Sequence, residues 1–141
     1  NNLVDDLHVS ISGNNLAWQR WDGQDWEIFL YNGTTGVTQQ LTNNTVDDTK
    51  PQISGLNVVW ERQTVDPTVQ LSNIDIYLYN GTNTTKISNH SGDDVNPVIS
   101  GSNVAWVSFF DIDPDPNVDE QSPEIFFYNG ATTRRLTNNT K

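Results

Sequence analysis

Apolar residues along this 141-residue chain alternate with a period of two in short segments, and one such segment occurs three times. At 16–18, 58–60 and 104–106 the sequence reads LAW, VVW and VAW, so two large side chains point one way and a smaller one points the other. A period of two is typical of a β-strand, whose successive side chains lie on opposite faces of the sheet. No stretch has helical spacing over a useful length, so the pattern predicts an all-β fold.

A second repeated segment is apolar at every position. It reads IFLY at 28–31, IYLY at 76–79 and IFFY at 125–128. An antiparallel sheet with one face in water would alternate apolar and polar residues along each strand. These strands therefore belong to sheets covered on both faces, and we expect the Trp of each LAW, VVW or VAW segment to be a core residue between sheets.

The two segments belong to a longer repeat. Equivalent units begin at Asn1, Asn43, Asn89 and Asn138, which gives repeat lengths of 42, 46 and 49 residues. Each unit has four strand-like segments: one such as QIS, the VVW-like segment, the IYLY-like segment and a polar segment such as TTKISN. Asn-Gly joins the last two and predicts a type I′ hairpin.

Repeated four-stranded antiparallel sheets packed face to face are the blades of a β-propeller. The chain is thus expected to be a single repeat domain, 1–141, with blade 1 at 1–42, blade 2 at 43–88 and blade 3 at 89–137. Residues 138–141 would open a further unit. A β-helix is the main alternative, but its rungs are shorter than these units.

The segment DDTKPQISGLNVVW at 47–60, followed by DIYLYNG at 75–81, resembles the TolB-type propeller repeat, also called the PD40 or WD40-like repeat. The resemblance extends over all three units. It implies a propeller fold but says little about function, because such blades serve many proteins. Two departures place the chain in a divergent branch: the usual Ser-Pro-Asp-Gly turn is shortened to Ser-Gly, and Val9 stands where the other units have proline.

Three blades cannot close a ring, because propellers typically have about 4–8. Left open, the first and last blades would each expose an apolar flank, and patches of that size rarely stay exposed on a soluble monomer. We therefore expect a homodimer in which two chains form one six-bladed propeller, the number usual in TolB-like rings. The chain ends just after a repeat point, which leaves complete blades for end-to-end packing. A nine-bladed trimer and a fragment of a longer propeller chain are the alternatives.

Composition narrows the range of partners. The formal net charge of −11 disfavours nucleic acid, because binding phosphates requires clustered Lys and Arg. No apolar run reaches the ~18 residues of a membrane span, so no membrane insertion is expected. The absence of Cys excludes disulfides and thiolate metal sites. An acidic composition rich in Asn, Thr and Ser suits a secreted protein, so we expect an extracellular or periplasmic, prokaryotic-type location.

Most of the 18 acidic residues fall in the loops between blades and between the second and third strands, which share one face of a propeller. That face would meet a cation or a basic partner. A ligand face on it would include Trp21, Asp47, Asp48, Asp93 and Asp94. The Asp pairs recur in every unit, however, and this favours a structural role as acceptors in tight turns.

The third unit carries an acidic insertion. Its oxygen-bearing side chains alternate along the chain, at Asp111, Asp113, Asp115, Asn117 and Asp119. Hard cations bind several oxygen ligands, so this spacing makes the insertion a candidate Ca²⁺ loop. A solvated acidic loop is the alternative, since the match to an EF-hand is poor. No cofactor is otherwise expected.

Catalytic motifs are absent from the sequence. His8 and His90 lie outside any nucleophile motif, and neither a G-x-S-x-G elbow nor a phosphate-binding Gly loop occurs. We therefore expect a non-catalytic module that serves as an interaction scaffold for a protein or glycan ligand. A propeller domain accessory to a secreted hydrolase, and a Ca²⁺-stabilised extracellular structural protein, remain as alternatives.

Overall fold

A computed structural model gives the fold of this chain and describes residues 4–66, 71–90, 92–111 and 121–138. The described residues form strands only, in three groups of four. The strands are β1 (Asp6–Ser12), β2 (Asn15–Trp21), β3 (Trp26–Asn32), β4 (Val37–Gln40), β5 (Asp48–Ser54), β6 (Asn57–Asp66), β7 (Leu71–Tyr79), β8 (Thr84–Lys86), β9 (Asp93–Ser100), β10 (Asn103–Asp111), β11 (Gln121–Tyr128) and β12 (Thr133–Arg135).

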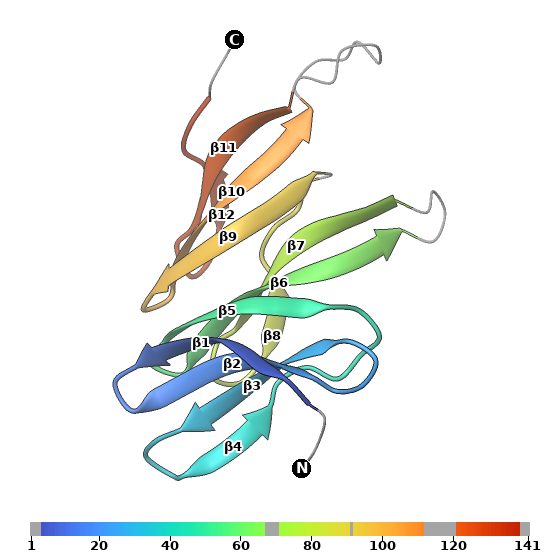
Figure 1. Ribbon diagram of the computed structural model, residues 1–141. Helices are drawn as coiled ribbons and strands as arrows, with labels where there is room; N and C mark the ends of the chain where they lie inside the picture. The colour runs from blue at the N-terminus through green and yellow to red at the C-terminus, as the bar shows by residue number, and fades with distance from the viewer. Residues whose placement is uncertain (1–3, 67–70, 91, 112–120, 139–141) are drawn as a thin grey trace.

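Each group is a separate antiparallel sheet in which consecutive strands pair in chain order. Figure 1 shows the three sheets following one another, with the ends of the chain at opposite ends of the series. The first strands β1, β5 and β9 lie next to one another, so they form the inner edge of the arc. This arrangement confirms the prediction of an all-β fold made of propeller blades.

Two apolar cores lie between the blades. Between blades 1 and 2, Trp60 packs in one cluster with Ile28 and is completely buried. Between blades 2 and 3, Trp106 packs in a second cluster with Ile76. Alternate residues of each second strand therefore face the preceding and the following blade, as their period of two predicts.

The first strands begin earlier than the QIS-like segments. Asp6, Asp48 and Asp93 are already in strands, where the sequence pattern placed the acidic pairs in interblade loops. Each inner strand then has a register shift, which leaves His8, Lys50 or Asn96 with a positive φ. A bulge of this kind adds one residue to a strand and bends it, so pairing resumes further along than simple alternation suggests.

The prediction of type I′ hairpins is wrong. That turn needs a positive φ at both central residues, but in blade 2 only Gly81 has one, at 89°, and Asn80 does not. The connection instead spans 80–83, between paired Tyr79 and Thr84. The Oδ1 of Asn80 accepts hydrogen bonds from the backbone N–H groups of Thr82 and Asn83, at 3.0 and 2.8 Å. This side-chain cap stabilises the longer turn.

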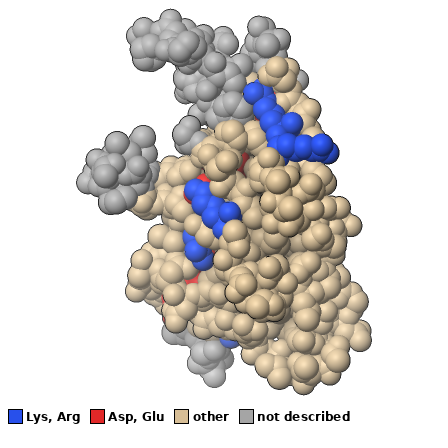
Figure 2. All heavy atoms as spheres, turned by 180° about the vertical axis from the view of Figure 1, so that it is seen from behind, with Lys and Arg blue, Asp and Glu red and all other residues tan. Residues whose placement is uncertain are grey.

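No helix among the described residues is long and apolar enough to span a membrane. Figure 2 shows that the side opposite to the view of Figure 1 is mostly uncharged, with Lys and Arg in separate groups.

Candidate functional site

Two residues of the predicted ligand face lie in the interior. Asp48 and Asp94 are both completely buried, which corrects their placement on an open surface. The Oδ1 of Asp48 accepts hydrogen bonds from Trp60 Nε1 at 2.6 Å and from Arg62 Nε at 2.7 Å. Their burial follows from the early start of the inner strands, which places these carboxylates under the preceding blade.

Asp47 and Asp93 are more exposed, but each holds two blades together. Asp47 Oδ1 accepts a hydrogen bond from the backbone N–H of Trp26, in the blade before it, at 3.1 Å. Asp93 Oδ1 accepts the equivalent bond from Ile74 at 2.9 Å. These contacts show how an Asp pair at each blade boundary can serve the fold.

Trp21 is half-buried and lies beside Trp26, with ring centroids 5.7 Å apart in an edge-to-face arrangement. The loop between them carries Asp22 and Asp25. Oxygen atoms of Asp22, Asp25 and Glu27 lie within 4.8 Å of one another. Burial and the neighbouring Glu27 and Asp22 charges raise the pKa of Asp25 to about 6. The three carboxylates thus form a compact acidic cluster in blade 1.

Sequence reasoning missed a buried acid in every blade. Glu27, Asp75 and Glu124 each precede the apolar third-strand segment and are completely buried. The acid was part of the repeated segment, as in DIYLYNG at 75–81, but its burial was not expected. The available signal was the recurrence of Glu or Asp directly before each Ile.

The predicted Ca²⁺ loop cannot be placed. Asp113, Asp115, Asn117 and Asp119 lie outside the described residues, and Asp111 is described only as the last residue of β10. Their role in metal binding stays a prediction.

The outer flank of blade 1 is an open apolar surface. Ile11 is 68% exposed, whereas its equivalent in blade 2, Ile53, is 7% exposed because blade 1 covers it. Trp18 is only half-buried, although the corresponding Trp60 is fully buried. A concavity of about 460 Å³ on this flank is lined by residues that include Leu16 and Trp18.

The outer flank of blade 3 is also an open apolar surface, and it exposes the side of the blade that a following blade would cover. Ile125 is 38% exposed, whereas the equivalent Ile76 is fully buried by the following blade. Likewise Leu136 is 53% exposed and its counterpart Ile87 only 6%. The two ends of the arc therefore present the two kinds of surface that pack together at the internal blade junctions.

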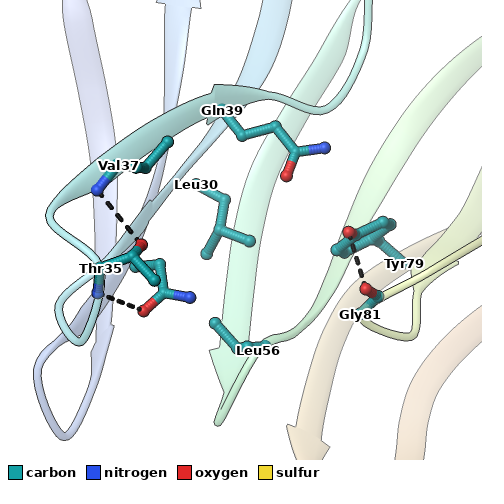
Figure 3. Close-up of a pocket in the computed structure, with 8 residues that line it drawn as sticks. Leu30, Thr35, Val37, Gln39, Leu56, Tyr79 and Gly81 are labelled. Carbon is teal, nitrogen blue, oxygen red and sulfur yellow. Dashed lines mark hydrogen bonds between the residues drawn. The ribbon is translucent and has the colours of Figure 1, made fainter.

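Two further hollows are formed by the described residues. One, of about 360 Å³, lies along the inner strands and is lined by residues that include His8, Lys50 and Asn96. The other, of about 180 Å³, lies between blades 1 and 2, where Figure 3 shows Leu30 and Tyr79 among its walls. The inner hollow is the larger of the two and is lined by the charged Lys50, so it is the better candidate for a ligand.

No family model and no curated protein matches the chain. Among solved structures, a TolB from Agrobacterium tumefaciens is similar at 17% identity with a TM-score of 0.64, over 94% of this chain and 49% of that chain. Hydrazine synthase from Kuenenia stuttgartiensis is similar at 12% identity with a TM-score of 0.64, over 92% and 25%. TolB from Acinetobacter baumannii is similar at 18% identity with a TM-score of 0.60, over 92% and 32%.

The chain thus spans half or less of the length of each of these structures. At such low identity the similarity concerns the fold and not the activity. Together with the three four-stranded sheets, it shows that this chain has a TolB-like β-propeller fold.

Proposed function

We propose that this chain is a non-catalytic propeller module that acts as an interaction scaffold, and that two copies close one six-bladed ring. The observation that carries the proposal is the pair of open flanks. The same repeat positions are buried at the internal junctions and exposed at the two ends, as Ile53 and Ile11 show. Packing blade 1 of each copy on blade 3 of the other would bury both flanks.

Polar groups at the ends support the same pairing. At the internal junctions the Nδ2 groups of Asn15 and Asn57 donate to the carbonyl oxygens of Gly55 and Gly101, both at 2.8 Å. Asn103 on the last blade and Gly13 on the first occupy the equivalent repeat positions. One copy can therefore offer the donor and the other the acceptor.

In the proposed dimer, blade 3 of one copy packs on blade 1 of the other, and we call this contact the closing junction. Two of the hydrogen bonds that link neighbouring blades within the chain have no counterpart there. Gln19 accepts a hydrogen bond from the backbone N–H of Lys50 at 2.8 Å, but the equivalent residue of blade 3 is Val107. Pro123 stands in the position of Trp26 and has no backbone N–H for an interblade Asp. The closing junction should therefore be weaker than the internal ones, so the dimer dissociates before the blades unfold.

The scaffold role requires surfaces that bind a partner, and we propose two. One is the inner hollow, and the other is the face that carries the loops between blades, with Trp21 and Asp93. Closure of the ring would complete the hollow, since β1, β5 and β9 of both copies would surround it. A protein or glycan partner fits the polar and aromatic side chains there. We place the module in the periplasm or outside the cell, as its acidic composition rich in Asn, Thr and Ser supports.

A mixing experiment with flank variants tests the proposal. Ile11→Asp should block the blade 1 flank and Leu136→Lys the blade 3 flank, so each variant alone should sediment as a folded monomer. In a mixture, one of the two junctions would join unmodified flanks and the other would join Asp to Lys. The mixture should therefore recover the dimer.

Val65→Asp is the matched control, because Val65 is 55% exposed but lies outside both flanks. It should leave the dimer intact. Dimers of either flank variant alone, or a mixture that stays monomeric, would contradict the proposed pairing of blades 1 and 3.

A further inference from the structure

Each blade buries one carboxylate at the same position of its third strand, and in two of the three blades a basic side chain forms an ion pair with it. A buried carboxylate begins the apolar part of each third strand. In blade 2 Asp75 pairs with Lys86 Nζ at 2.8 Å, and in blade 3 Glu124 pairs with Arg135 Nη2 at 2.8 Å. A buried charge needs such a partner, because its removal from water is costly.

Blade 1 lacks this basic residue. Lys86 pairs across the sheet with Tyr77, and Arg135 with Phe126. The residue in the same register of blade 1 is Gln40, opposite Phe29. Among the described residues, no Lys or Arg forms an ion pair with Glu27.

Blade 1 instead adds two more negative charges. Asp22 and Asp25 precede Glu27 in the connection between β2 and β3, and oxygens of all three lie within 4.8 Å of one another. Two ligands of one Ca²⁺ at about 2.3–2.6 Å from the ion can be no more than about 5 Å apart. The cluster therefore has the dimensions of a coordination shell.

Several of these oxygens are buried without a hydrogen bond. Asp25 is 4% exposed and Glu27 is fully buried, yet both oxygens of Asp25 and the Oε2 of Glu27 have no hydrogen-bond partner. Buried polar atoms are almost always satisfied, so orphaned carboxylate oxygens within one compact acidic cluster indicate a missing positive ligand.

We propose that Asp22, Asp25 and Glu27 bind a Ca²⁺ ion, which takes the place of the Lys or Arg found in the other two blades. All three ligands are carboxylates, and Ca²⁺ accepts six to eight oxygen ligands in flexible geometry. Mg²⁺ requires a near-ideal octahedron, and Zn²⁺ favours His and Cys ligands. Water would complete the shell on the open side, where Asp22 is exposed.

The loop is already shaped for this role. The Oδ1 of Asp22 accepts hydrogen bonds from the backbone N–H groups of Gln24 and Asp25, at 2.8 and 3.1 Å. Gly23 has a φ of 111°, which lets the chain turn tightly between the two aspartates. The Asp22 carboxylate is thereby held with its second oxygen available. The site lies within a single blade and does not depend on ring closure.

Calcium titration of the chelator-treated full chain tests this site. Tb³⁺ is a suitable probe, because Trp21 and Trp26 flank the loop and can sensitise its luminescence. Ca²⁺ should displace Tb³⁺ and raise the melting temperature, since it binds the folded state. Asp25→Asn, which keeps the shape of the side chain, should weaken binding at least about tenfold, as losses around metal sites typically do.

The acidic insertion of blade 3 needs its own control. An Asp113→Asn/Asp115→Asn double variant should keep the calcium response of the unmodified chain. Loss of the response in this variant, together with its retention in Asp25→Asn, would overturn the assignment to blade 1. An equal rise in melting temperature with Mg²⁺ would overturn the assignment to Ca²⁺.

The sharpest variant restores the residue that the other blades have. Gln40→Lys should stabilise the chelator-treated protein and abolish most of the calcium response, because the ammonium group would occupy the site. Gln39→Lys adds the same charge at the neighbouring position of β4, on the other side of the strand, and should leave the response unchanged. Equal calcium responses of both lysine variants and the unmodified chain would refute the proposal.

Discussion

The buried carboxylates of Asp48 and Asp94 occupy the same repeat position but have different hydrogen-bond donors around them. Asp48 accepts from Trp60 and Arg62, whereas Asp94 accepts from Trp106 but meets Ser108 where Arg62 would be. In every blade the Asp and its Trp partner are separated by 12 residues. That constant spacing was visible in the sequence, but the burial of the pair depends on the neighbouring blade.

Trp60→Ala should remove the largest fully buried side chain of the core between blades 1 and 2. The expected loss is about 3–5 kcal/mol of unfolding free energy, from the cavity and the lost burial. Denaturant unfolding followed by circular dichroism measures it. Val65→Ala, at an exposed position, should change stability by less than about 0.5 kcal/mol. Equal stabilities of the two variants would show that Trp60 is not a core residue.

The raised pKa of the buried Asp94 carboxyl predicts that the stability of the fold depends on pH. Burial raises the pKa of Asp94, an effect only partly offset by the nearby Ser108 hydroxyl and the hydrogen bond from Trp106, and the buried Asp75 charge raises it further. The folded state then holds the proton more tightly than the unfolded state, where the pKa is about 3.9. The stabilisation from protonated Asp94 is complete below that value and is lost as pH rises through the folded pKa.

Asp94→Asn should therefore gain stability relative to the unmodified chain as pH rises from about 4 to 7. Urea unfolding at a series of pH values measures the difference. Asp48→Asn is the control, because loss of its ion pair with Arg62 should destabilise the fold at neutral pH. A difference between Asp94→Asn and the unmodified chain that does not vary with pH would contradict this account.

At the scale of the strands, the alternation of apolar and polar residues predicted which segments form the sheets. It did not predict the bulges and turns near the ends of the strands. The apolar segments at 58–60 and 76–79 lie in β6 and β7 and face both neighbouring blades, as expected. The bulge at Lys50 and the four-residue turn at 80–83 were not predicted. Both depend on backbone and side-chain hydrogen bonds that a hydrophobic pattern does not contain. The acidic cluster of blade 1 was missed for a related reason, since only the β2–β3 connection brings its members together.

The first hairpin supplies a test at this scale. A Cβ added to Gly33 would lie 2.2 Å from the backbone oxygen of Asn14, so the neighbouring turn would have to move. Gly33→Ala should therefore cost about 1–3 kcal/mol, as overpacking does. Gly36, with a φ of 70°, has nothing within 4 Å of an added Cβ. Gly36→Ala should cost only about 1–2 kcal/mol, from the left-handed backbone alone.

Thermal melts of both glycine variants measure these costs. Gly33→Ala should also perturb the hydrogen bond that the backbone N–H of residue 33 donates to Asn15 Oδ1, which is 3.0 Å long with Gly33 in place. Unchanged stability of Gly33→Ala would mean that the two turns do not pack together.

At the scale of the molecule, the chain is an open arc whose ends match its own internal junctions. The fold was predictable from the repeat, because each blade needs neighbours on both faces. The proposed calcium site was not, since it arises from a difference between blades. Gln40 in place of Lys86 or Arg135, and Val107 in place of Gln19 or Glu61, distinguish blades that otherwise share one plan.

The mass of the unmodified chain in solution tests ring closure most directly. Light scattering at micromolar concentration should give about twice the 15.8 kDa chain mass. Closure of a six-bladed ring requires that value, because it is the smallest assembly that covers both apolar flanks. A stable, folded monomer at that concentration would contradict the account.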